Sequence, residues 1–73
     1  PTQDEAAAAR EALDQLRFVL EELAERTQQV FAATRIDGLT YSEAADALGI
    51  SDSSVQKHLA RAVLHVMRRM KPL

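Results

Sequence analysis

Glycine and proline occupy only four of the 73 positions in this chain, and this scarcity limits the possible folds more than any other feature. The prolines are Pro1 and Pro72, and the glycines are Gly38 and Gly49. The segment 2–37 therefore contains neither of the residues that most disfavour a helix interior. No segment shows the apolar–polar alternation of a half-buried strand. We predict an all-α fold.

The first half of the chain is predicted to form two helices. Thr2 and Glu5 have the spacing of a capping box, and a set of leucines at helical spacing is predicted to face the core: Leu13, Leu16, Leu20 and Leu23. One helix spanning the whole segment is out of scale for so small a domain. We therefore expect a break near 24–26, although no strong helix breaker marks it.

The second helix is expected over 27–36, with three inward-facing residues, Val30, Phe31 and Thr34. Asp37 and Gly38 then form a strong stop and turn signal. Together these elements predict a compact four-helix domain covering residues 1–73. Residues 1–12 are a linker or an extension of the first helix, 13–36 hold the first two helices, and 40–70 form a helix-turn-helix.

The segment 40–70 has the pattern of a helix-turn-helix. Thr40 and Glu43 form a second capping box, which opens a short helix ending at Leu48. Gly49 supplies the turn, and Ser51 caps a last helix that is predicted to end near Met70, before Pro72. Small Ala45 suits the close approach of the two helices, and three apolar residues are expected to fill their contact: Leu48, Ile50 and Val55.

Charge is distributed unevenly along the chain. The formal net charge is −2, which by itself argues against a nucleic-acid partner. Residues 1–50 contain four Lys/Arg and ten Asp/Glu, whereas residues 51–73 contain five Lys/Arg and one acid, Asp52. The attractive field for an anion is thus concentrated on the last helix. A solvated charged face with a basic tail would produce the same pattern.

At about 100° per residue, the last helix divides into three surfaces. The predicted core face contains Val55, Leu59, Ala62, Val63, Val66 and Met70. The predicted basic face spans an arc of about 80° and contains Lys57, Arg61, His65 and Arg68. Three apolar residues lie between the two faces and are expected to be exposed: Ala60, Leu64 and Met67.

This basic face suits DNA. The major groove admits an α-helix, in which Arg or Lys can donate to guanine and Gln can pair with adenine. Ser51, Ser53 and Ser54 are short enough to let phosphate approach the helix N-terminus, whose free N–H groups favour an anion. Asp52 is expected to repel a nearby phosphate, or else to accept a hydrogen bond from cytosine N4.

Other classes of protein fit the sequence poorly. The chain has no cysteine, which excludes disulfides and thiolate metal sites and favours a reducing cytoplasm. No apolar run approaches the roughly 20 residues of a membrane span, no signal peptide is visible, and a start at Pro1 indicates a processed or excised piece. His58 and His65 lie about 10.5 Å apart along the helix axis, too far to share a metal ion. The acids Glu21, Glu22 and Glu25 are expected on a solvated helix surface. We predict no enzymatic activity and no cofactor.

Two segments resemble a known family. RTQQVFAATRIDGLTYSEAADALGIS begins at Arg26, and SSVQKHLARAV begins at Ser53. From Leu13 to Met70 the chain is similar to region 4 of extracytoplasmic-function (ECF) sigma-70 factors. The motifs DGLTYSE and SSVQKH are most similar to the iron-starvation sigma factors of the ferric-citrate type. The resemblance implies a winged-helix-like domain without the wing, which binds the promoter −35 element in a bacterial cytoplasm.

The resemblance also implies roles for particular residues. Its −35 readers correspond to Gln56, Lys57, His58, Ala60 and Arg61. Its phosphate contacts correspond to Thr40, Tyr41 and the turn 51–54 (Asp52, Ser53 and Ser54 included), with Arg35 as a further candidate. Two positions depart from the family pattern: Ala44 replaces a large aliphatic residue, and no proline stands near Ala24.

The partners implied by the resemblance are promoter DNA, the β flap of core RNA polymerase, and an anti-sigma factor or membrane-linked sigma regulator. Phe18 and Val19 extend the apolar surface of the first helix beyond its leucines, so they are our candidates for docking on the polymerase. They could equally broaden the core contact. The −10-binding region is expected upstream in the full reading frame.

Two other functions remain open at this point. The helix-turn-helix pattern also fits the output domain of a response or quorum-sensing regulator, which would bind a palindromic operator as a dimer. A helical protein-interaction module is the alternative outside DNA binding. Its adhesive surface would then comprise Phe18, Val19, Leu64 and Met67.

Overall fold

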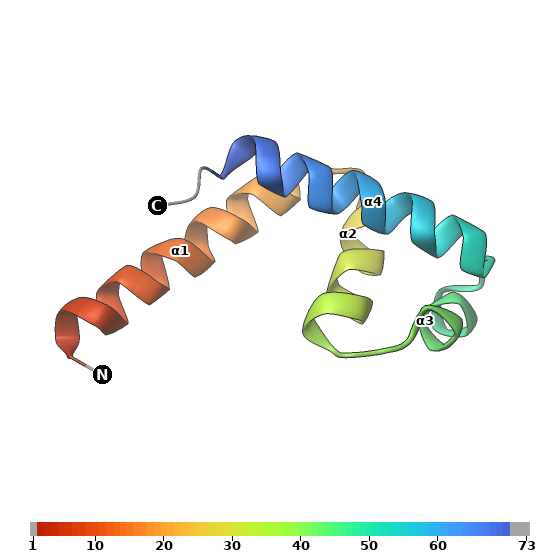
Figure 1. Cartoon of the computed structure of the whole chain (residues 1–73), viewed down its shortest axis with the longest axis horizontal. Helices are drawn as coiled ribbons and strands as arrows, with labels where there is room; N and C mark the ends of the chain where they lie inside the picture. The colour runs from red at the N-terminus through yellow and green to blue at the C-terminus, as the bar shows by residue number, and fades with distance from the viewer. Residues whose placement is uncertain (1, 71–73) are drawn as a thin grey trace.

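The computed structural model describes residues 2–70, and all of its regular elements in that range are helices, as predicted. Its elements are α1 (Gln3–Glu21), α2 (Glu25–Phe31), the π-helix η1 (Ala32–Ile36), α3 (Tyr41–Leu48) and α4 (Asp52–Arg69). Helix α4 crosses the molecule and packs on α1, α2 and α3, so it is the common partner of the other three α-helices (Figure 1). The predicted Pro72 stop lies outside the described residues.

Helix α1 begins at the predicted capping box. The Thr2 hydroxyl accepts a hydrogen bond from the Glu5 backbone N–H at 3.1 Å, and the Thr2 N–H donates to the Glu5 carboxylate at 3.2 Å. The N-terminal part of α1 then projects away from the other helices (Figure 1). Leu13 is consequently 65% exposed, so the prediction that it faces the core is wrong. Leu16, Leu20 and Leu23 are half-buried, and Val19 is the buried residue of α1.

The break between the first two helices falls at residues 22–24, slightly earlier than predicted. The Leu23 N–H donates to the Leu20 carbonyl at 3.0 Å, which tightens the last turn of α1. The Leu23 carbonyl accepts a hydrogen bond from the Gln28 side-chain amide at 2.8 Å. Ala24 is the N-cap of α2 and has no side-chain cap, which explains why no capping residue marked this break.

Helix α2 runs directly into η1, so the second predicted helix exists but changes its geometry at Ala32. The Asp37 N–H donates to the carbonyl of Ala32, five residues earlier, at 2.9 Å. Val30 is fully buried, whereas Phe31 and Thr34 are half-buried. Gly38 follows with φ +75°, the left-handed backbone conformation expected after a helix end.

The core lies where α2, η1 and α3 meet α4. Its buried residues are Val30, Ala33, Ala44, Ala45, Val55 and Leu59, and half-buried apolar side chains surround them. Ala44, one of the two departures from the pattern of the resembling family, is fully buried. On α4 the predicted core face is confirmed: Val55, Leu59 and Ala62 are buried, and Val63, Val66 and Met70 are half-buried.

Candidate nucleic-acid interface

The turn between α3 and α4 has the predicted geometry. Gly49 is the C-cap of α3 with φ +68°, and the Ile50 N–H donates to the Ala45 carbonyl at 3.0 Å. The Ser51 hydroxyl accepts a hydrogen bond from the Ser54 N–H at 3.1 Å and so caps α4. Ala45 is only 2% exposed. A larger side chain at this position would therefore push the two helices apart. These contacts hold the start of α4 at the surface.

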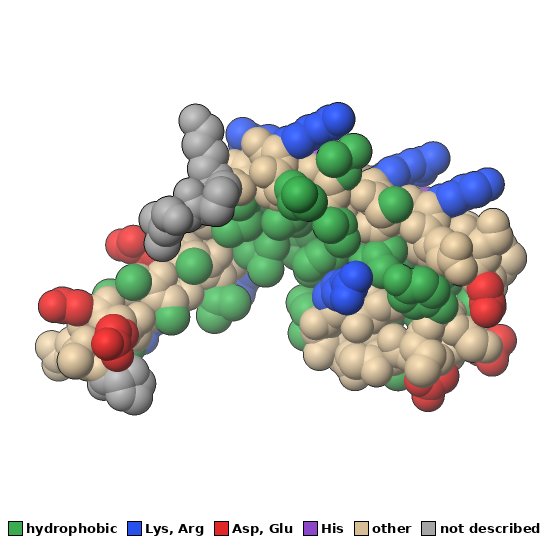
Figure 2. Space-filling model, viewed as in Figure 1, with side chains coloured by type: hydrophobic (Ala, Val, Ile, Leu, Met, Phe, Trp, Pro, Cys, Tyr) green, Lys and Arg blue, Asp and Glu red, His purple; other side chains and the backbone are tan. Residues whose placement is uncertain are grey.

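An outer surface of α4 carries exposed polar and basic side chains. Seven of the predicted DNA-binding residues on α4 are exposed: Asp52, Ser53, Gln56, Lys57, Ala60, Arg61 and Arg68. Figure 2 shows Lys and Arg side chains projecting in a row along the outer edge of α4, while Asp and Glu side chains lie over α3 and the start of α1. The opposite face of α4 is buried in the core, so this outer surface is free to approach a partner.

His58 lies closer to the core than the other predicted base readers. Its side chain is half-buried, and its Nδ1 lies 2.9 Å from the hydroxyl oxygen of Thr27 on α2. Thr27 is itself 2% exposed. The sequence did not predict this contact, because the two residues are 31 positions apart and belong to different helices.

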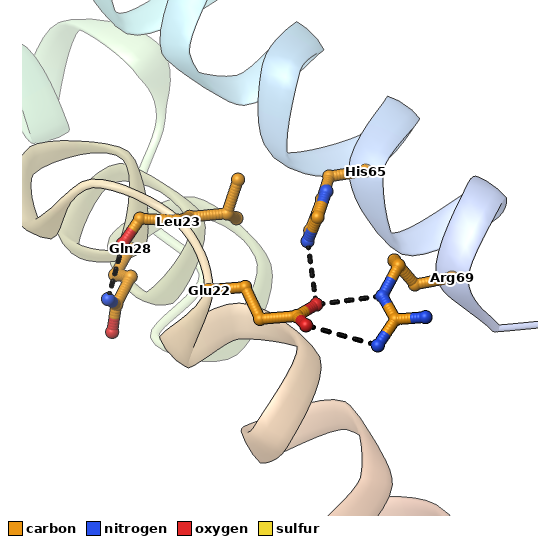
Figure 3. A network of polar contacts seen from close by, with 5 residues as sticks. All are labelled: Glu22, Leu23, Gln28, His65 and Arg69. Carbon is orange, nitrogen blue, oxygen red and sulfur yellow. Dashed lines mark hydrogen bonds and ion pairs between the residues drawn. The ribbon is translucent and has the colours of Figure 1, made fainter.

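His65 is bound to α1 instead of standing free in the predicted basic face. Its Nε2 lies 3.1 Å from Oε1 of Glu22 (Figure 3). Arg69, which the sequence reasoning missed, donates to both carboxylate oxygens of Glu22, at 2.9 and 3.0 Å. The Arg69 hydrogen bonds hold the pKa of Glu22 below its usual range, and the His65 contact adds to this effect. Glu22 is exposed, as expected, and it is in addition an ion-pair partner.

A shallow hollow brings together predicted contact residues from three elements. Arg35 of η1, Tyr41 of α3, and Gln56 and Ala60 of α4 line a space of about 320 Å³. Tyr41 is 40% exposed, and Arg35 is exposed as well. A cation, a phenol hydroxyl and an amide thus converge beside the basic row of α4. They provide hydrogen-bond donors of the kind that bind phosphate.

At the starts of α3 and α4, near this hollow, some polar groups form hydrogen bonds within the protein. The Thr40 hydroxyl accepts from the Glu43 N–H at 3.0 Å, and the Thr40 N–H donates to the Glu43 carboxylate at 2.9 Å. This backbone hydrogen bond holds the pKa of Glu43 below its usual range. At the start of α4, Asp52 and Ser53 are exposed, and Ser54 is half-buried. The hydroxyl of Thr40 is therefore engaged in capping, whereas Ser53 is accessible.

Two further polar and apolar features were not predicted. Arg26 donates from Nη1 to the Leu48 carbonyl at 2.9 Å, which fastens the start of α2 to the end of α3. An apolar groove of about 600 Å³ lies between α1 and the helices α2 and η1, with Leu13, Leu20 and Ile36 in its lining.

The two proposed docking residues have different environments. Phe18 is 68% exposed, whereas Val19 is 4% exposed and packs in the interior. Val19 therefore cannot serve as a surface contact, and only Phe18 remains a docking candidate. The three apolar residues between the faces of α4 are exposed as expected, with Leu64 at 47% and Met67 at 68%.

Residues 2–70 offer neither a cluster of metal ligands nor a membrane-spanning helix. No group of three or more His, Asp or Glu side chains in this range is arranged to hold a metal ion. Over the same residues, no helix combines the length and apolar character required to cross a bilayer.

The fold and the surface of α4 define a helix-turn-helix domain with an exposed basic second helix. The model of the family "Sigma-70, region 4" matches residues 13–66. The chain belongs to this family, as its motifs predicted, and this membership agrees with the expectation of a non-enzymatic protein.

One relative is the ferric citrate uptake sigma factor FecI of Escherichia coli (strain K12), which is 42% identical over 67 residues. The matched segment covers 92% of this chain and 39% of FecI, so the chain spans about two fifths of that relative. No solved structure matched the chain. The family match favours a sigma factor over the output domain of a response or quorum-sensing regulator.

Proposed function

We propose that this chain is the promoter-binding domain of an ECF sigma factor of the ferric-citrate type, and that it directs transcription initiation by binding the −35 element. The exposed Gln56, Lys57 and Arg61 on the second helix of the helix-turn-helix carry this proposal. An α-helix fits the major groove, where these side chains can donate hydrogen bonds to base edges. Arg35, Tyr41 and Ser53 flank them and contact phosphates.

The other predicted contact residues are proposed to have different roles. Ala60 offers an apolar contact, such as one to a thymine methyl, and Asp52 accepts from a cytosine amino group. Arg68 lies two turns beyond Arg61 and contacts the DNA backbone. His65 and Thr40 are engaged within the protein, so they contribute less than the resemblance alone implied.

Selection of binding sites from a random-sequence duplex pool tests the proposal. The wild-type chain should enrich one short motif, with affinity that falls steeply as salt increases. Arg61→Ala should cost about 1–3 kcal/mol on that motif and relax the preference at one base pair. Arg10→Ala is the matched control, since it removes the same charge from an exposed position on α1. Equal losses for the two variants, or affinity that is insensitive to salt, would exclude this DNA face.

We also propose that the domain docks on the β flap of core RNA polymerase through α1. Phe18 is 68% exposed, and the neighbouring groove exposes further apolar surface to a partner. Pull-down of the isolated β flap should weaken on Phe18→Ala. Met67→Ala is the matched comparison, because Met67 is also 68% exposed but lies on α4. A larger loss with Met67→Ala would place the protein-binding surface on α4 and favour the helical interaction module.

The remaining proposals concern regulation and location. We place the full protein in the bacterial cytoplasm, where an anti-sigma factor or membrane-linked sigma regulator controls it. The test is whether the chain captures such a regulator, and whether the captured regulator competes with the β flap for the surface around Phe18. Persistence of capture after Phe18→Ala would assign the regulator a different surface.

A further inference from the structure

Thr27 is the only buried polar residue among residues 2–70, and it contacts His58, one of the predicted base-reading residues. It is 2% exposed in the first turn of α2, and its hydroxyl oxygen lies 2.9 Å from His58 Nδ1. Helix α2 makes its most extensive packing contact with α4. A buried hydroxyl aimed at a residue of the DNA-facing helix is not needed to fill the core, because a valine would fill the same volume.

The hydrogen bond assigns the position of the imidazole proton. A hydroxyl group has one proton to donate, and leaving that proton unpaired in a buried site is costly. The Thr27 hydroxyl has no other hydrogen-bond partner among the described residues. It must therefore donate to Nδ1, which then carries no proton. In the neutral ring this places the proton on Nε2.

The Nε2–H group of His58 reaches the surface. His58 is half-buried, and within residues 2–70 its Nε2 has no hydrogen-bond partner in the protein. No side-chain nitrogen or oxygen in that range is buried without a partner, so this nitrogen is accessible to solvent. Arg61 lies three residues further along α4, which puts it on a neighbouring position of the same helix surface.

From this geometry we propose that Thr27 is a positioning residue for DNA recognition, which holds His58 with Nε2–H directed outward as a neutral hydrogen-bond donor. The inference rests on the proposed function, since it assumes that this surface of α4 meets DNA. The target is a hydrogen-bond acceptor on the duplex, either a phosphate oxygen or an acceptor on a base edge. Thr27 touches no DNA and acts only through the imidazole.

The first test requires no DNA. The imidazole ¹⁵N shifts of His58 in the wild-type chain should report the Nε2–H tautomer. Thr27→Val keeps the branched shape but removes the hydroxyl, so the ring should shift toward a mixture of tautomers. Thr27→Ser retains the hydroxyl and should restore the wild-type spectrum. A wild-type ring with the proton on Nδ1, or one unaffected by Thr27→Val, overturns the inference.

The second test measures affinity for the duplex selected by the wild-type chain. Loss of one net hydrogen bond corresponds to a decrease of roughly twofold to tenfold for Thr27→Val. Thr27→Ser should bind nearly as well as the wild type. In a His58→Ala background, Thr27→Val should cause no further loss, because its effect passes through the imidazole. An equal loss in both backgrounds would assign Thr27 a purely structural role and refute the proposal.

Two further observations separate failure of the DNA-binding function from failure of the Thr27 proposal, and a phosphate acceptor from a base acceptor. If the wild-type chain enriches no duplex, the proposed DNA-binding function fails, while the tautomer measurement still decides whether Thr27 orients His58. Repeating the selection with His58→Ala identifies the acceptor. A uniform loss of affinity over all sequences indicates a phosphate oxygen, whereas lost preference at one base pair indicates a base edge.

Discussion

Arg69, in the last turn of α4, donates two hydrogen bonds to the carboxylate of Glu22, the C-cap residue of α1, at 2.9 and 3.0 Å. The two residues are 47 positions apart, and their bidentate pairing ties the end of the first helix to the end of the last (Figure 3). Glu22 raises the pKa of Arg69 in return. The pair thus stabilises the junction at which α1 turns into α2.

The Glu22 pair should make stability depend on pH. Because the Arg69 hydrogen bonds lower the pKa of Glu22 in the folded state below its ordinary value of 4.5, the stabilisation is fully present above that pH. It is lost as the pH falls through the lowered folded-state value. Glu22→Gln should therefore destabilise the chain at pH 7 and have little effect in strong acid. Urea denaturation across this range measures the difference.

Glu21→Gln is the matched control, since Glu21 precedes Glu22 on α1 and is exposed. It removes the same charge without breaking the Arg69 hydrogen bonds, so it should destabilise the chain at pH 7 less than Glu22→Gln does. Glu43 also has a lowered pKa, so acid should still destabilise the Glu22→Gln chain in part. An unchanged difference between wild type and Glu22→Gln from pH 7 to strong acid would contradict the pairing.

The two capping boxes should contribute unequally. Thr40→Ala removes the N-cap of α3 inside the helix-turn-helix and should reduce the free energy of unfolding by about 1 kcal/mol. Thr2→Ala removes the same cap from the exposed start of α1, where fraying is not coupled to the core. It should leave the global stability nearly unchanged. Thermal unfolding compares them, and equal losses would mean that the start of α1 unfolds together with the core.

Gly49 tests the backbone geometry of the turn. Its φ is +68°, and no atom outside its chain neighbours lies within 4 Å of the place where a Cβ would stand. Gly49→Ala should therefore cost roughly 1–2 kcal/mol through backbone strain alone. Gly49→Asn should cost less, because asparagine adopts this conformation more readily. Denaturant unfolding of both variants tests this order, and a larger loss for asparagine would indicate a steric conflict.

Truncating Val55 to alanine should destabilise the chain more than truncating Leu13, although leucine is the larger residue. Val55 is fully buried, so Val55→Ala should destabilise the chain by about 2 kcal/mol through lost burial and the cavity it leaves. Leu13→Ala removes more apolar atoms, but Leu13 is 65% exposed, so its loss should be below about 0.5 kcal/mol. Unfolding midpoints in urea provide the measurement. A large loss at Leu13 would indicate that α1 packs more extensively in solution.

Much of the helix-turn-helix was predictable because its signals are local. Both capping boxes, the left-handed glycine at the turn and the buried face of α4 depend on residues within a few positions of each other. Their geometry follows from helix periodicity and backbone stereochemistry. For the same reason, the exposed positions of Lys57 and Arg61 could be assigned from spacing once the core face of α4 was known.

The break at 22–24 and the environments of His58, His65 and Leu13 were decided only by the tertiary structure. No glycine, proline or capping side chain marks the break, and contacts from Gln28, His65 and Arg69 stabilise it. His58 and His65 were both predicted to contact DNA, but partners on α2 and at the end of α1 engage them. Periodicity determines which side of a helix a residue occupies. Only the packing of helices determines whether another chain segment covers that side, since those partners are tens of residues away.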